Sequence, residues 1–97
     1  MTGSARSSDG LDPRRRRALF RAWHRGTREM DLLLGRFADA YIEALSEADL
    51  AHLEALMEVP DRDLFAWVTG RDPVAANYET PLYRALVAFH ATRHEQD

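Results

Sequence analysis

The segment Arg25-Gly26-Thr27-Arg28-Glu29 places an arginine, a glycine and a glutamate at a spacing that suits contact with another protein. Arginine offers a forked set of donors and glutamate offers acceptors, so each can form charge-assisted hydrogen bonds with a partner. Gly26 has no side chain, so a second backbone can approach it closely. The alternative is structural: Gly26 only ends a helix, and Arg25 and Glu29 pair in an exposed contact worth about 0.5 kcal/mol. The segment is therefore a candidate docking turn or a plain helix end.

Residues of the kinds that build catalytic and metal sites are present but scattered. His90 and His94 lie four residues apart, the spacing at which two imidazoles on a helix share a metal or at which both favour the negative end of the helix dipole. His24 and His52 stand alone. The chain has no cysteine and no glycine-rich phosphate loop, which excludes a thiolate nucleophile, a disulfide framework and a nucleotide fold of that type. We expect no catalytic residue, no metal site and no stably bound cofactor.

Charge is divided unevenly along the chain. Residues 1–28 contain eight Arg and two acidic residues, for a charge of +6, whereas residues 29–97 contain five Arg and fourteen acidic residues, for a charge of −9. The run Arg14 to Arg17 is either a solvated helix start that carries partner-facing charge or part of a nucleic-acid surface. The acidic overall pI of 5.8 favours the first interpretation, because nucleic-acid binders are usually basic overall. The sequence thus predicts a partner with an acidic patch, no nucleic acid and, without a long apolar run, no membrane.

Capping residues and apolar residues at helical spacing predict five short helices and no strand. The helices are expected to begin at Asp12-Pro13, Thr27, Ser46, Pro60 and Thr80-Pro81. The first helix is expected to end at Gly26, the third at Val59-Pro60, the fourth at Gly70 and the fifth near the chain end, and residues 71–79 form a loop. We predict an all-α fold, a compact bundle of five short helices in one domain over residues 13–92. Residues 1–12 are expected to be a disordered leader and residues 93–97 a frayed C-terminus.

The buried faces of the predicted helices consist of large apolar residues three and four positions apart. They include Leu19, Phe20, Trp23, Met30, Leu33, Leu34, Phe37, Tyr41, Ile42, Leu50, Leu53, Leu56, Met57, Leu64, Phe65, Trp67, Val68, Leu82, Tyr83, Leu86, Val87 and Phe89. Trp67 is assigned to the core, although an aromatic binding face is the alternative.

The sequence resembles the succinate dehydrogenase assembly factors of the SdhE type, which are also called flavinylation factors. Their Arg-Gly-x-x-Glu motif is similar to Arg25-Gly26-Thr27-Arg28-Glu29, followed by an apolar helix that begins Met30-Asp31-Leu32-Leu33-Leu34. The likeness extends over about residues 14–92. It includes Phe37 and the stretches Leu56-Met57-Glu58-Val59-Pro60-Asp61 and Asp63-Leu64-Phe65-Ala66-Trp67-Val68-Thr69-Gly70.

The resemblance implies a non-enzymatic assembly factor that binds the flavoprotein subunit of succinate dehydrogenase, or of fumarate reductase, and promotes covalent attachment of FAD to that client. It implies a partner-binding site at Arg25, Gly26 and Glu29, and we add Trp23 and Met30 as apolar flanks. FAD would belong to the client, and the free factor would be a monomer in the bacterial cytoplasm rather than the mitochondrial matrix. The alternative is an antitoxin-like or nucleic-acid-associated regulator that acts through the N-terminal arginine cluster.

Overall fold

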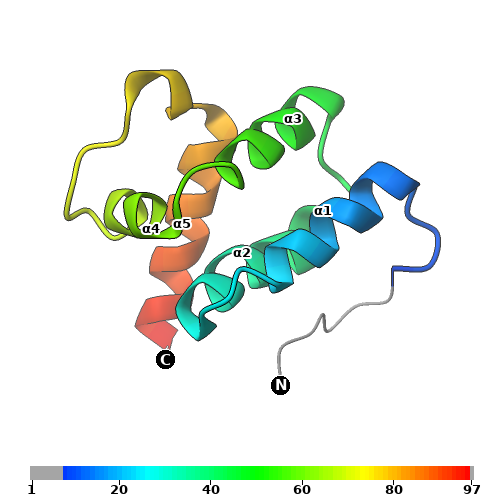
Figure 1. Ribbon diagram of the computed structural model, residues 1–97, viewed down its shortest axis with the longest axis horizontal. Helices are drawn as coiled ribbons and strands as arrows, with labels where there is room; N and C mark the ends of the chain where they lie inside the picture. Colours follow the sequence, from blue (N-terminus) through cyan, green and yellow to red (C-terminus); the bar gives the residue numbers. More distant parts are fainter. Residues whose placement is uncertain (1–7, 97) are drawn as a thin grey trace. The chain divides into compact units, whose positions relative to one another are not determined.

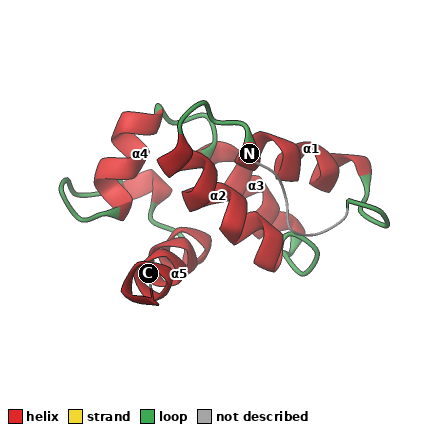
Figure 2. Ribbon diagram, turned by 90° about the horizontal axis from the view of Figure 1, so that it is seen from below, coloured by secondary structure: helices red, strands yellow, loops and turns green. Residues whose placement is uncertain are grey.

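The computed structural model describes residues 8–96, and for residues 93–96 it describes the backbone alone. These residues form five α-helices and one short 3-10 helix, and they contain no strand (Figure 1, Figure 2). The predicted all-α class with five helices is therefore confirmed. The chain divides into two compact units, one that ends at Ser46 and one that begins at Glu47. The single domain predicted over residues 13–92 stays a prediction.

The first unit is a helical hairpin. Helix α1 (Pro13–Trp23) packs along helix α2 (Arg28–Tyr41), and a short turn joins them (Figure 1). Both helices begin where capping chemistry predicts, because Asp12 Oδ2 accepts from the Arg15 N–H at 3.2 Å and Thr27 Oγ1 accepts from the Met30 N–H at 3.3 Å. The two caps fix the ends of the turn and the helix directions on either side of it.

The segment before α1 differs from the predicted leader. Residues 1–7 lie outside the described residues, but residues 8–12 form a turn in which the Leu11 N–H donates to the Ser8 carbonyl at 3.2 Å. Gly10 has a φ of +87°, a conformation that glycine adopts without strain. Leu11 is only 6% exposed. Residues 8–12 thus form a turn in which Leu11 is buried and Asp12 caps α1.

The core of the first unit follows the predicted stripes, with two exceptions. Phe20 is 62% exposed and Tyr41 is 43% exposed. Leu19 and Trp23, four residues apart, take the buried face of α1, so Phe20 lies about 100° away around the helix on the solvent side. Tyr41 ends α2, where its ring lies 5.0 Å from the ring of Phe37 instead of entering the interior. The predictions that both rings are buried are wrong.

The second unit contains α3 (Glu47–Leu56), α4 (Asp61–Val68), the 3-10 helix η1 (Ala76–Tyr78) and α5 (Pro81–Gln96). Helix α5 packs against α3 and against α4. Its start is capped as predicted, since Thr80 Oγ1 accepts from the Tyr83 N–H at 3.1 Å. The predicted loop over residues 71–79 includes η1, and α5 continues through residues 93–96, where the sequence predicts a frayed end. None of the helices within residues 8–96 combines the length and the apolar character needed to cross a lipid bilayer.

Helix α4 ends at a glycine, as the sequence predicts. Gly70 has a φ of +82°, its N–H donates to the Trp67 carbonyl at 3.1 Å, and the Arg71 N–H donates to the Ala66 carbonyl at 2.8 Å. This pair of bonds is the Schellman arrangement, which satisfies the last carbonyls of a helix.

Trp67 differs from its predicted place in the core. It is half-buried, its ring centroid lies 5.5 Å from that of Tyr78, and it lines an open groove of about 560 Å³ together with Tyr83 and Val87. Phe65 is half-buried as well, so α4 buries Leu64 and Val68 and leaves its aromatic residues at the edge. Truncation of Trp67 is therefore not expected to cost the full free energy of unfolding that is lost when a completely buried aromatic side chain is removed.

Candidate functional site

The connection between α1 and α2 carries the Arg-Gly-x-x-Glu motif. Helix α1 ends at Trp23, and His24 is its capping residue, with its N–H donating to the Arg21 carbonyl at 3.2 Å. Gly26 lies two residues beyond that cap and has a φ of +109°. It is therefore not the residue that ends the helix, and it turns the chain toward α2. Any side chain at this position would be strained, although a Cβ would meet no atom within 4 Å.

A buried carboxylate fixes the shape of this turn. Asp31, in the first turns of α2, is 5% exposed, and its Oδ1 accepts from the Arg25 backbone N–H at 2.6 Å. The Asp31 N–H in turn donates to the Thr27 carbonyl at 2.9 Å. A hydrogen bond from a backbone N–H to a buried carboxylate is strong, so it holds Arg25 and Gly26 in one conformation. The sequence alone places Asp31 near the start of the apolar helix that follows the motif and does not reveal this hydrogen bond.

The motif residues face outward from the fixed turn. Gly26 and Glu29 are exposed, and Arg25 is half-buried. Glu29 lies in the first turn of α2, whose N-terminal N–H groups favour a negative charge. The arrangement exposes a bare stretch of backbone and a carboxylate on one preformed surface, which can bind a partner without first ordering a loop.

Trp23 and Met30, which we predict to flank the contact, lie in the interior at 7% and 2% exposed. The Trp23 indole lies directly over Gly35 of α2: a Cβ built on Gly35 would be 2.3 Å from Trp23 Cδ2. Trp23 Nε1 also donates to Asp39 Oδ1 at 3.0 Å. Gly35 and Asp39 thus lie four residues apart under one ring, and they hold the end of α1 against α2. Trp23 and Met30 support the turn from beneath and do not offer it an apolar surface.

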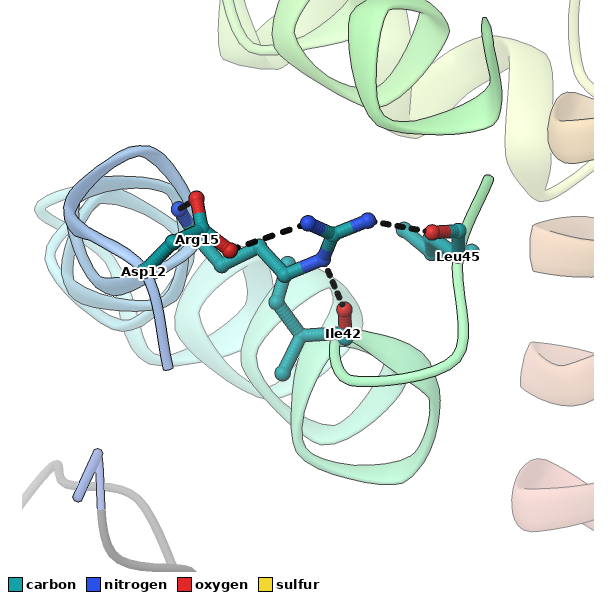
Figure 3. Close-up of polar contacts among 4 residues, drawn as sticks. All are labelled: Asp12, Arg15, Ile42 and Leu45. Atoms are coloured by element: carbon teal, nitrogen blue, oxygen red, sulfur yellow. Dashed lines mark hydrogen bonds and ion pairs between the residues drawn. The ribbon is translucent and has the colours of Figure 1, made fainter. Parts of the chain in front are cut away.

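Arg15 closes the opposite end of the hairpin (Figure 3). Its Nε donates to the Ile42 carbonyl at 2.9 Å, one guanidinium nitrogen bonds Asp12 Oδ1 at 2.9 Å and the other bonds the Leu45 carbonyl. The Ile42 and Leu45 carbonyls lie at and just beyond the end of α2, where carbonyl groups find no partner within the helix. The contact with Arg15 also lowers the pKa of the Asp12 carboxyl. The run Arg14 to Arg17 is therefore not one uniform surface, because Arg15 caps α2.

The remaining candidate groups do not form a centre in the described part of the chain. His90 is half-buried, and the side chain of His94 lies outside the described residues, so the predicted alternatives for this pair stay open. His52 buries its Nδ1 without a hydrogen-bond partner. No group of three His, Cys, Asp or Glu side chains that could hold a metal is found among the described residues.

Comparison with known proteins gives this hairpin a context. A family model described as "Flavinator of succinate dehydrogenase" matches residues 16–90, which include most of α1, the motif turn and α2. The chain belongs to this family. The resemblance that the motif suggests is therefore confirmed.

Relatives of this flavinator occur in bacteria and eukaryotes. The "FAD assembly factor SdhE" of Acetobacter pasteurianus is 40% identical over 86 residues, which cover 89% of this chain and 79% of that protein. "Succinate dehydrogenase assembly factor 2, mitochondrial" of Dictyostelium discoideum is 35% identical and that of Danio rerio is 31% identical. The matches cover 82% and 91% of this flavinator but only 56% and 57% of those two proteins. No solved structure matches the chain. The comparisons give no support to the antitoxin-like or nucleic-acid-associated alternative.

Proposed function

We propose that this flavinator promotes covalent attachment of FAD by binding the flavoprotein subunit of succinate dehydrogenase through Arg25, Gly26 and Glu29. The observation that carries the proposal is the Arg25–Asp31 hydrogen bond of 2.6 Å, because it presents the motif residues on a turn that is already in one conformation. The names of the relatives, which refer to FAD assembly and to succinate dehydrogenase assembly, indicate the client. Fumarate reductase is a second client to be tested in the same way.

The bond to FAD is formed within the client, and this chain supplies binding energy that holds the client's FAD and acceptor residue in a productive arrangement. This division of roles fits a motif whose residues offer hydrogen bonds and close backbone approach. FAD is accordingly a ligand of the client and not a stable cofactor of this chain. We propose that the free chain is a monomer and that it acts in the bacterial cytoplasm, since the bacterial relative matches over 79% of its own length.

Reconstitution with purified components tests the proposal. The apo flavoprotein subunit of the same organism is mixed with FAD and increasing amounts of the chain, and covalent flavin is measured as fluorescence of the denatured subunit. We expect Glu29→Ala to weaken client binding about 10- to 150-fold, the equivalent of losing one charge-assisted bond of about 1.5–3 kcal/mol. Because Glu29 is exposed, the helical content and the melting temperature should stay near those of the wild type.

Saturation distinguishes a binding residue from a catalytic one. A binding defect in Glu29→Ala is overcome at high concentration, so the maximal rate of flavin attachment is unchanged, whereas loss of a catalytic group lowers that maximal rate. Glu43→Ala is the matched control, because Glu43 is an exposed carboxylate beyond the other end of α2. Equal client affinity for wild type, Glu29→Ala and Glu43→Ala would show that Glu29 does not bind the client and that the motif only shapes the turn. No effect of the wild-type chain on covalent flavin would overturn the proposed function itself.

A further inference from the structure

The solvent-facing side of α1 has an unusual composition. Beyond Pro13, the exposed residues of this helix recur at helical spacing and form one stripe, which we call the α1 stripe: Arg16, Arg17, Phe20, Arg21 and the capping residue His24. Helix α1 contains no acidic residue, so the stripe is basic along its whole length. It leads directly into the motif turn, since His24 precedes Arg25.

Phe20 is the centre of the stripe and exposes most of its surface to solvent. At 62% it is more exposed than Tyr41, the other large apolar side chain found exposed in the described part of the chain. A single exposed apolar residue needs no explanation by itself, but this one is held in place. Its ring is stacked on the ring of His24, with 3.9 Å between the ring centroids and 13° between the ring planes.

The hydrogen bonding of His24 shows how the pair is fixed. His24 Nδ1 lies 2.7 Å from the Phe20 carbonyl oxygen. A carbonyl oxygen can only accept, so the imidazole carries its hydrogen on Nδ1 and donates it there. The bond and the stack together restrict both side chains to one arrangement. A partner that binds them therefore does not have to order two mobile rings, which removes part of the entropy cost of association.

We propose that the α1 stripe is a second contact surface for the flavoprotein subunit, continuous with the motif turn, and that it seats Phe20 in an apolar socket surrounded by carboxylates. The proposal rests on the proposed function, because it takes the same client. Aromatic and arginine side chains are the residue types that contribute most to binding at protein interfaces. A basic rim with no acid of its own is complementary to an acidic partner surface, which raises the association rate. The three exposed arginines of the stripe, Arg16, Arg17 and Arg21, supply this basic rim.

Binding of purified apo flavoprotein subunit to the full chain tests the stripe. We expect Phe20→Ser to weaken the affinity at least tenfold without lowering the melting temperature, because the ring buries little area in the free chain. Tyr41→Ser is the matched control, since it removes the other exposed ring from the far end of the hairpin, and it should bind like the wild type. Equal affinities for Phe20→Ser and Tyr41→Ser would overturn the inference.

Charge is tested separately. Neutralising two arginines of the stripe in Arg17→Ser/Arg21→Ser should slow association and flatten its dependence on salt. The control Arg62→Ser/Arg71→Ser removes the same charge from exposed positions in the second unit and should leave the salt dependence unchanged. If both double variants change association equally, the effect is one of net charge and the stripe is not a contact surface.

Two other occupants of the stripe would also overturn the inference, and each gives a distinct result. Sedimentation would detect a second copy of this chain as a dimer that Phe20→Ser abolishes while client affinity stays unchanged. A nucleic acid would bind in a manner that needs the arginines but not Phe20. Failure of the proposed function is distinguishable from all of these, because in that case the wild-type chain does not bind the flavoprotein subunit. If the wild type binds and Glu29→Ala weakens binding but Phe20→Ser does not, only the stripe is refuted.

Discussion

Replacement of Gly35 by alanine gives the sharpest test of how the hairpin is built, because two effects with opposite signs compete. In a solvent-exposed helix, alanine in place of glycine stabilises by about 1 kcal/mol. In this hairpin the new Cβ would lie 2.3–2.6 Å from three atoms of the Trp23 ring, whereas ordinary contact begins near 3.4 Å. The indole must therefore move by roughly 1 Å or the helices must separate.

The expected balance is a net loss of stability. Overpacking of this kind costs about 1–3 kcal/mol, and displacement of the Trp23–Asp39 hydrogen bond adds about 1 kcal/mol. After the propensity gain of about 1 kcal/mol is subtracted, Gly35→Ala should destabilise the chain by about 1–3 kcal/mol. For a domain of this size a loss of 2 kcal/mol lowers the melting temperature by roughly 8–16 °C.

Chemical denaturation measures this loss, and tryptophan fluorescence locates it. The chain has two tryptophans, so a Trp67→Phe background leaves Trp23 as the reporter of the hairpin. Ala51→Gly, at an exposed position inside α3, serves as the control and should cost about 1 kcal/mol from propensity alone. If Gly35→Ala is neutral or stabilising, Trp23 does not pack on Gly35 in the way described.

Two further predictions concern carboxylates. Asp31→Ala should destabilise the chain by about 1–3 kcal/mol, because it leaves the Arg25 N–H without its acceptor. Asp31→Asn keeps an oxygen acceptor and should retain most of the stability. An unchanged denaturation midpoint in Asp31→Ala would contradict this prediction. The pKa of Asp12 is lowered from its ordinary 3.8, so its stabilisation is present above that pH and is lost as the pH falls through the lower folded value. The free energy of unfolding should therefore fall more steeply with decreasing pH for the wild type than for Asp12→Asn. Parallel curves for the two proteins would exclude this role of Asp12.

The helix starts and the end of α4 are predictable from the sequence because their determinants are local. Asp12, Thr27 and Thr80 each cap a helix through a side chain that reaches only three residues along the chain. Gly70 ends α4 for a similar local reason, since it adopts a positive φ immediately after the helix. Contacts of this range are encoded in neighbouring residue types, so composition and spacing are sufficient.

The features that the sequence does not reveal depend on how elements meet. The Asp31 bond reaches back six residues across a turn whose shape is not known in advance. Gly35 lies under Trp23 only because α1 and α2 pair in one register. The exposure of Phe20 could not be predicted either, because Leu19, Phe20 and Trp23 are all large and apolar and only the packed structure shows which face of α1 is buried. Each of these is a tertiary outcome that overrides residue type.

The hairpin also determines when the docking turn can form. The contacts that fix it, from the Thr27 cap to the Asp31 bond and the Trp23–Gly35 packing, connect residues at most twelve positions apart in the sequence. Closing such short loops costs little chain entropy, so structure of this kind forms quickly and early in folding. The motif turn is thus specified by contacts within the first unit, and it forms with the local steps of folding rather than with the long-range contacts.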